Sequence, residues 1–143
     1  MIEAVVDANI LLRLLTGKPP EQAARAREIL DLALQRSIAV LLAPMILAEV
    51  AYVLSRVYGW PRSSVVDGLI ELLDTEPLVV LDRPVVERML RWFREHQAFD
   101  LPDAYVAALA ADRGHGNMIS FDRALRRITA IHLIDTPAAV PSA

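Results

Sequence analysis

The feature that most constrains the fold of this sequence is an alternation between short apolar runs and longer segments with helical periodicity. Ile2–Val6 is a short apolar run that ends at Asp7, as a buried strand would. Residues 21–36 instead repeat apolar side chains on one helical face, such as Ile29 and Ala33. Strands that alternate with helices favour a parallel sheet covered by helices. The sequence therefore predicts an α/β fold, a three-layer α/β/α arrangement around a parallel sheet of about five strands.

The other elements follow from the same two patterns and from turn-forming residues. Pro44, Pro61 and Pro102 lie near predicted helix starts, and Gly59 and Gly114 near helix ends. The predicted strands are 2–6, 38–43, 78–81, 118–120 and 130–133, and the predicted helices are 9–15, 21–36, 62–73, 84–97, 103–113 and one from Pro44 that Gly59 ends. One domain is expected over residues 1–135, followed by an unstructured tail at 136–143.

Composition limits the class of protein. A chain of 143 residues suits one domain with one core. Its apolar content of 55% is high for a globular domain, so either the core is large or apolar surface meets a partner. We therefore expect a homodimer. With no cysteine, neither disulfides nor thiolate metal sites can form, which fits a reducing cytoplasm.

Membrane insertion and binding by charge alone are not expected. The longest apolar run, Ile38–Ala48, is about half of the roughly 20 residues that a spanning helix needs, and Pro44 interrupts it. A secretory signal would begin with basic residues, but none precedes Asp7. A cytoplasmic location is therefore expected. The net charge of −3 argues against a protein that coats nucleic acid by charge.

Four acidic residues stand apart from the charged helix faces. Asp7 and Asp122 directly follow predicted strands, and Glu49 and Asp103 lie on early turns of predicted helices. Open parallel sheets bind ligands beyond the carboxyl ends of their strands. These four acids can therefore converge on one cleft.

Carboxylates gathered in one cleft repel one another, and a divalent cation offsets that repulsion. Hard oxygen ligands favour Mg²⁺, for which Mn²⁺ can substitute. Such a site suits hydrolysis of phosphodiester bonds by metal-activated water, and pairs of ions about 4 Å apart are typical of it.

Each acid also has a structural interpretation. Asp7 and Asp122 could cap the helices that follow them, and Asp100 could cap the helix that carries Asp103. Asp103 is placed where a helix dipole favours a negative charge. Glu49 is harder to explain in this way, because its neighbours are apolar and carboxylates are rarely buried without a partner.

The order of these residues resembles the successive motifs of the PIN-domain family over about residues 2–134. The matching segments are Val6-Asp7-Ala8-Asn9-Ile10-Leu11, Ala48-Glu49-Val50, Asp100-Leu101-Pro102-Asp103-Ala104 and Ser120-Phe121-Asp122. In size the chain resembles the toxin of a VapBC-type toxin–antitoxin pair.

The resemblance implies a metal-dependent endoribonuclease that forms a homodimer and is blocked by a small antitoxin protein. By motif match, Asp7, Glu49 and Asp103 would form an acidic triad, with Asp122 as the fourth acid of the metal site. The secondary site residues would be Asp100, Asn9 and Ser120. Pro102 departs from the pattern and could shift how deeply the start of its helix reaches into the cleft.

Two further surfaces are expected around this site. The candidates for RNA-phosphate contact lie near the acids in sequence and are Arg13, Arg123, Arg126 and Arg127. Four leucines soon after Asp7 cannot all face inward on one short helix. With the helix at 21–36, they could form a groove for the antitoxin, or they could belong to the core. The two tryptophans, Trp60 and Trp92, are interpreted as packing residues.

Other functions stay open or fail on single residues. A haloacid-dehalogenase-like phosphatase would need a second Asp where this chain has Asn9, and a receiver domain would need a Lys late in the chain, where Lys18 is the only one. A PIN-like fold kept as a silent RNA-binding or scaffold module is the remaining alternative to a nuclease.

Overall fold

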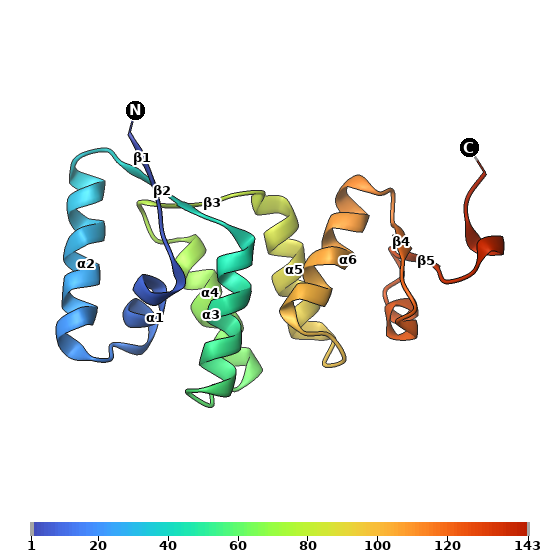
Figure 1. The fold of residues 1–143 in the computed structure, drawn as a ribbon, viewed down its shortest axis with the longest axis horizontal. Coiled ribbons are helices and arrows are strands. Elements are labelled where there is room, and N and C mark those ends of the chain that lie inside the picture. The colour runs from blue at the N-terminus through green and yellow to red at the C-terminus, as the bar shows by residue number, and fades with distance from the viewer. Residues whose placement is uncertain (1, 143) are drawn as a thin grey trace. The chain divides into compact units, whose positions relative to one another are not determined.

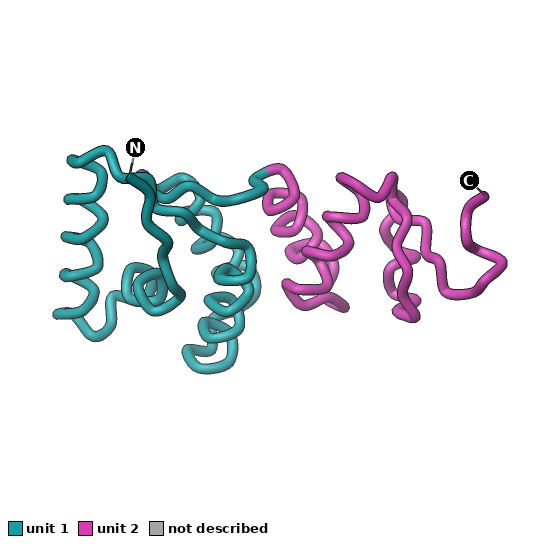
Figure 2. The backbone as a smooth tube through the Cα atoms, turned by 45° about the horizontal axis from the view of Figure 1, so that its top comes forward, with its two compact units in different colours: residues 1–83 teal, residues 84–143 magenta. Residues whose placement is uncertain are grey.

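The computed structural model describes residues 2–142 and divides the chain into two compact units. Unit 1 comprises residues 1–83 and unit 2 comprises residues 84–143 (Figure 2). Each unit has its own parallel strands and its own buried apolar residues.

Unit 1 is built on a parallel three-stranded sheet in the order β1-β2-β3 (Figure 1). Val5 pairs with Leu41, and Leu41 pairs with Val79, so the carboxyl ends of the three strands lie at one edge. The elements of unit 1 are β1 (Glu3–Val5), α1 (Ala8–Thr16), α2 (Pro20–Gln35), β2 (Ala39–Leu42), α3 (Pro44–Arg56), α4 (Arg62–Leu73) and β3 (Leu78–Val80).

The helices of unit 1 form where apolar spacing and proline agree. Pro20 and Pro44 occupy the first turns of α2 and α3, where a missing backbone N–H breaks no helical hydrogen bond. On α3, Leu47, Val50 and Leu54 share one face and are fully buried. Burial of each such side chain stabilises the fold by about 1.5–3 kcal/mol. This packing fixes α3 against the rest of unit 1.

Helix α1 divides its leucines between two environments. Leu11 and Leu12 are core residues, whereas Leu14 and Leu15 are half-buried. The expectation that not all four leucines can face inward is therefore confirmed, and the core interpretation holds for Leu11 and Leu12, because the face of α1 that carries them is covered within unit 1.

Unit 2 pairs its two strands, β4 and β5, in parallel, with Met118 opposite Leu133 (Figure 1). Both tryptophans pack as expected. Trp92 is buried in unit 2, and in unit 1 the Trp60 ring lies close to Gly68 on α4. The elements of unit 2 begin with α5 (Arg83–Glu95), whose first residue is the last of unit 1. They continue with α6 (Leu101–Arg113), β4 (Asn117–Ile119), the 3-10 helix η1 (Arg123–Arg127), β5 (His132–Ile134) and the 3-10 helix η2 (Pro137–Ala139).

A glycine fixes the entry into β4. Gly116 has φ +84°, and a Cβ atom there would overlap the carbonyl oxygen of Ala130. Its own carbonyl accepts a hydrogen bond of 2.8 Å from the backbone N–H of His132. The backbone segments that enter β4 and β5 therefore approach each other so closely that only glycine fits at position 116.

The α/β class with parallel strands is confirmed. Residues 2–142 contain five strands, which form a three-stranded sheet in unit 1 and a two-stranded sheet in unit 2 where one sheet of about five strands was expected. Helix α4 has its predicted bounds, and the remaining elements are shifted by a few residues at most. The segment at 136–143, expected to be unstructured, includes η2, and its Ala139 carbonyl lies 2.9 Å from Nε2 of His132. No helix within residues 2–142 has the length and apolar character to span a membrane.

Candidate metal and nucleic-acid site

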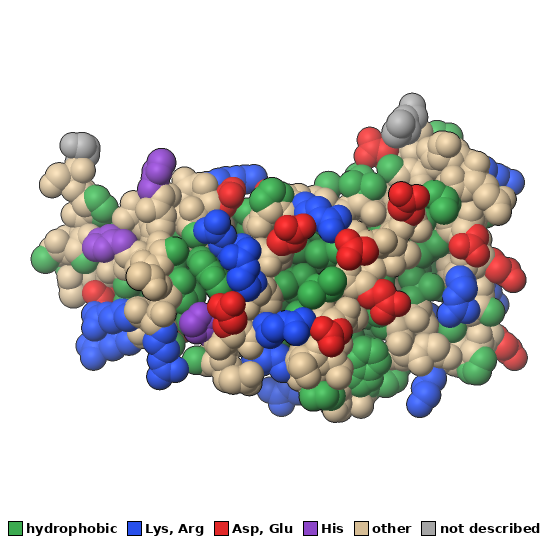
Figure 3. Space-filling view, turned by 180° about the vertical axis from the view of Figure 1, so that it is seen from behind, with side chains coloured by type: hydrophobic (Ala, Val, Ile, Leu, Met, Phe, Trp, Pro, Cys, Tyr) green, Lys and Arg blue, Asp and Glu red, His purple; other side chains and the backbone are tan. Residues whose placement is uncertain are grey.

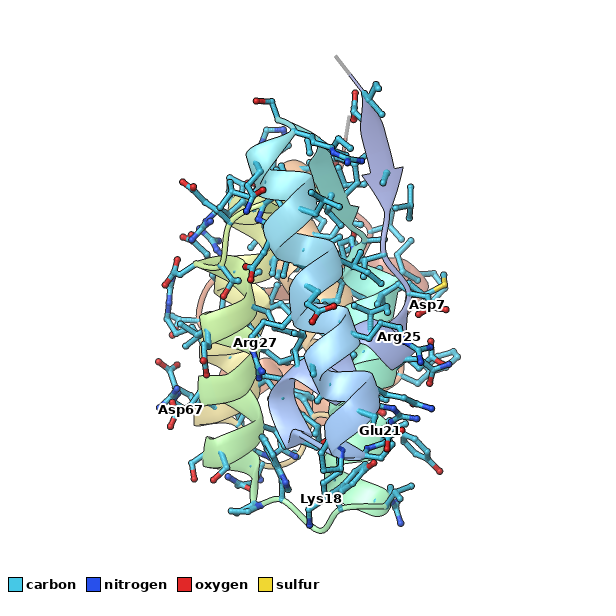
Figure 4. The ribbon with its side chains drawn as sticks, turned by 90° about the vertical axis from the view of Figure 1, so that its left-hand side faces the viewer. Asp7, Lys18, Glu21, Arg25, Arg27 and Asp67 are labelled. Atoms are coloured by element: carbon cyan, nitrogen blue, oxygen red, sulfur yellow. The ribbon has the colours of Figure 1, made fainter. Side chains whose placement is uncertain are left out.

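Asp7 lies between β1 and α1 and performs a structural task there. Its Oδ1 accepts a hydrogen bond of 3.1 Å from the backbone N–H of Asn9, which caps α1. The side chain is exposed at the end of the β1 ribbon (Figure 4). The capping interpretation of Asp7 is confirmed, and the same geometry leaves its Oδ2 open to a ligand.

Glu49 lies on the second turn of α3, beyond the carboxyl end of β2. The expectation that its apolar neighbours bury it is wrong, because Leu47 and Val50 point into unit 1 while Glu49 faces outward and is exposed. It has no hydrogen bond or salt bridge among the residues that the structure describes. Its position in the chain, and not its burial, is what marks it as a site residue.

The start of α6 is held by two aspartates. The Asp103 backbone N–H donates a 2.9 Å hydrogen bond to Asp100 Oδ1, and the Asp100 N–H donates one of 3.4 Å to Asp103 Oδ2. This capping box begins the helix at Leu101, two residues before the predicted start at Asp103. Pro102 falls in the first turn, where its ring is accommodated, and Asp100 is confirmed as a cap.

Asp103 is held in an environment that disfavours its negative charge. Partial burial raises the pKa of the Asp103 carboxyl above its ordinary value, and its interaction with the Asp100 side chain raises it further. The negative charge of Asp122 also raises this pKa. Asp122 is therefore close enough to Asp103 for the two carboxylates to repel each other.

Asp122 is oriented by its neighbours on both sides. Its Oδ1 accepts a 3.0 Å hydrogen bond from the Ala124 N–H and caps η1, which confirms the capping interpretation. Its own N–H donates a 3.0 Å hydrogen bond to the Ser120 hydroxyl oxygen. Ser120 thus fixes the backbone that presents Asp122, and its hydroxyl hydrogen remains available to another acceptor.

The structure brings some of the predicted acids together. Asp100, Asp103 and Asp122 interact within unit 2. In unit 1, Asp7 and Glu49 follow the neighbouring strands β1 and β2 and have no direct interaction with each other. Within either unit, the described residues contain no group of three His, Asp or Glu side chains arranged to hold a metal.

The donor chemistry of unit 2 nevertheless fits a divalent cation. Carboxylate oxygens are the ligands that Mg²⁺ prefers. A cation beside Asp103 and Asp122 would offset the repulsion that now raises the pKa of Asp103.

The predicted phosphate contacts fall into two groups. In unit 1, Arg13 Nε donates a 2.7 Å hydrogen bond to Gln22 Oε1. Both line a hollow of about 140 Å³ between α1 and α2. Arg25, which Figure 4 labels on α2, lines it as well. Arg25 was missed in the sequence, and the available signal was its separation from Gln22 by three residues, which places both on one helical face.

In unit 2, the three arginines of η1 differ in their partners. Arg126 forms a 2.8 Å salt bridge with Asp135, whose side chain is only 15% exposed. Arg123 and Arg127 are exposed and form no salt bridge with any residue in 2–142. Figure 3 shows basic side chains gathered over this part of unit 2. Arg123 and Arg127 are therefore the pair most available to a phosphate.

An α/β domain with carboxylates beyond the ends of parallel strands is the class that this fold and these residues define. A family model described as the PIN domain matches residues 4–131, and the chain belongs to that family. No curated protein matches the sequence. PIN domains are generally nucleases and commonly use divalent metals, so the match supports a hydrolase that acts on nucleic acid. Membership in this family removes the phosphatase alternative.

Proposed function

We propose that this chain is a Mg²⁺-dependent endoribonuclease that works through its acidic residues. The observation that carries the proposal is the raised pKa of Asp103 beside Asp122, in a chain that belongs to the PIN family. Carboxylates crowded together are costly for a fold to maintain unless a cation uses them. The proposed metal-site and catalytic acids are Asp7, Glu49, Asp103 and Asp122.

The side chains of this chain have separable tasks in that reaction. When bound, the cation would supply the positive charge that activates water and stabilises the charge developing on the phosphate. A bound cation would favour the charged form of Asp103 and so oppose the upward shift of its pKa. Asp100 positions Asp103 by fixing the start of α6, and Ser120 positions Asp122 through its backbone.

The arginines would hold the RNA and not the metal. Arg123 and Arg127 lie on η1 directly after Asp122, and Arg13 lies on α1 after Asp7. A guanidinium that is already paired, as in Arg126, is less available to a phosphate. We assign Arg126 mainly to holding Asp135 and the other three to phosphate contact.

The test is cleavage of a labelled single-stranded RNA by the purified chain with Mg²⁺, with Mn²⁺ and with excess EDTA. Cleavage is expected with either metal and should cease in EDTA. Undiminished cleavage in EDTA would overturn the metal-dependent mechanism. RNA binding without cleavage, together with no metal binding by calorimetry, would favour the silent RNA-binding module instead.

We further propose that the chain is the toxin of a type II pair and that its partner is a small antitoxin. A mostly apolar hollow of about 660 Å³ in unit 1 lies between β1 and α2, is lined by Val5, Ile10, Ile29 and Leu32, and reaches Asp7. An amphipathic peptide in this hollow would bring a basic side chain to the acid. The test is growth of cells that express the chain with and without its neighbouring gene. Unaffected growth, with no co-purifying partner, would overturn the toxin role.

A homodimer is proposed on the exposed apolar surface. Val5, Met45 and Val57 are more than 70% exposed. Light scattering at micromolar concentration is expected to give twice the chain mass, and a monomer would contradict it.

A further inference from the structure

Phe121 is an aromatic side chain that unit 2 leaves 89% exposed, between Ser120 and Asp122. It is not isolated, because Ile119 and Val140, which are 84% and 58% exposed, line the same hollow, and a contiguous exposed apolar patch marks an interaction site. We propose that Phe121 and the hollow beside it bind one unpaired nucleobase of the substrate RNA. The inference rests on the proposed nuclease function and names how that site selects its substrate.

The hollow beside Phe121 has the chemical character of a base-binding site. It measures about 430 Å³, within the roughly 300–1,000 Å³ that small-ligand sites occupy. A nucleobase has two apolar faces and a polar edge. The apolar lining residues are Ile119, Phe121, Ile134, Pro137 and Val140, and the polar ones are Ser120, Asp135 and Thr136.

Charge around the hollow favours RNA over a neutral apolar partner. Arg123 and Arg127 follow Phe121 on η1, are exposed and have no salt bridge among the described residues. Two exposed cations two and six residues after an exposed ring in the chain fit a base attached to its phosphates. The salt bridge between Arg126 and Asp135 keeps the polar side of the hollow in place.

The chain order links this base to the reaction. Phe121 directly precedes Asp122, one of the four proposed metal-site acids. A base on the ring would therefore belong to a nucleotide next to the scissile phosphate. Because bases in a duplex are already stacked, the site selects single-stranded RNA.

The experiment measures binding and cleavage separately. Binding of a fluorescent single-stranded RNA is followed by anisotropy in EDTA, which prevents cleavage, and KM and kcat are measured with Mg²⁺. Phe121→Ala should weaken binding by about 5- to 150-fold, the usual range for loss of one stacked base. Phe121→Trp should bind at least as tightly as wild type, and Phe121→Leu should bind more weakly. Tyr52→Ala is the control, because it removes a 64% exposed ring from α3, and it should change neither the affinity for RNA nor KM.

A series of RNAs with one abasic position each locates the base. Removal of the base at one position next to the cut should weaken RNA binding by the wild type. The Phe121→Ala variant should bind this abasic RNA as tightly as it binds the intact RNA. Unchanged binding and KM in Phe121→Ala would overturn the base site. A large fall in Tm, or a change in mass by light scattering, would also overturn it, because the ring would then be packed against protein. If binding depends on Phe121 but wild type never cleaves, the base site stands and the proposed nuclease fails.

Discussion

The two units hold their acidic residues in different ways. In unit 2, Asp100, Asp103 and Asp122 interact, and the pKa of Asp103 rises as a result of burial and of its two neighbours. In unit 1, Asp7 precedes α1, Glu49 lies on α3, and the two do not interact directly. The charge repulsion expected of a metal site is therefore already present within unit 2, whereas unit 1 supplies carboxylates that the fold tolerates easily.

Two of the proposed metal-site acids also have a structural role. Asp7 caps α1 and Asp122 caps η1, each through one carboxylate oxygen. Asn caps a helix about as well as Asp. An Asp→Asn change at either position therefore separates the charge from the cap.

The largest expected effect is on cleavage. Asp7→Asn, Glu49→Gln and Asp103→Asn should each lower kcat by at least about 100-fold, the usual scale for removal of a group that stabilises transition-state charge. Their Tm values should stay near that of wild type. Asp112→Asn, near the other end of α6, is the matched control and should cleave normally. A collapse of Tm in these variants would show that the acids are structural.

The next largest effect is on the stability of unit 2. Gly116→Ala should destabilise the chain by about 2–4 kcal/mol, because a positive φ and an overlap with the Ala130 carbonyl act together. Gly17→Ala is the comparison in unit 1, since its φ is +68° but a Cβ there meets nothing within 4 Å. It should cost about 1 kcal/mol. Urea denaturation measures both, and equal losses would contradict the close approach at Gly116.

A smaller effect is expected for the arginines of η1. The double variant Arg123→Glu with Arg127→Glu should weaken RNA binding about tenfold. The slope of log K against log salt concentration should become less steep by roughly 0.7 for each lost phosphate contact. Arg126 is left intact, because its loss would leave Asp135 unpaired. The control is Arg27→Glu with Arg91→Glu, two exposed positions on α2 and α5 with the same change in net charge. Equal binding by both double variants would assign the effect to net charge alone.

The smallest effect is the pH dependence of stability. Folding raises the pKa of Asp103 above 3.8, so the folded chain holds this proton more tightly than the unfolded chain. That contribution is fully present below 3.8 and is lost as pH rises through the folded pKa. Without metal, Asp103→Asn should therefore gain stability relative to wild type as pH rises toward neutral. Thermal melts across this range test it, and a constant difference in Tm would contradict it.

Much of the fold could be predicted from local patterns. Arg62–Leu73 was predicted with its observed bounds, because Pro61 and the apolar spacing both act within that segment. The start of α6 was missed by two residues. The capping pair is visible in the sequence as two Asp residues three positions apart, but only the backbone shows that both hydrogen bonds form.

The site could be predicted only in part, because side-chain exposure depends on packing between elements. The sequence marked Glu49 by its apolar neighbours, yet those neighbours turn inward and Glu49 does not. Phe121 was passed over, since an aromatic next to a strand ordinarily packs into a core, and its 89% exposure is a property of the folded unit. Arg25 could be placed beside Gln22 from their spacing, but its position in one hollow with Arg13 depends on the packing of α1 against α2.

The parallel pairing of β4 and β5 limits how this protein can change by insertion and deletion. Parallel neighbours need a crossover of about a dozen residues, and the segment between these strands is residues 120–131. Asp122 and the η1 arginines lie on that crossover, so a deletion that shortens it breaks the strand pair and the proposed site together. Insertions into the segment leave the pairing possible. Related sequences should therefore lengthen this connection far more readily than they shorten it.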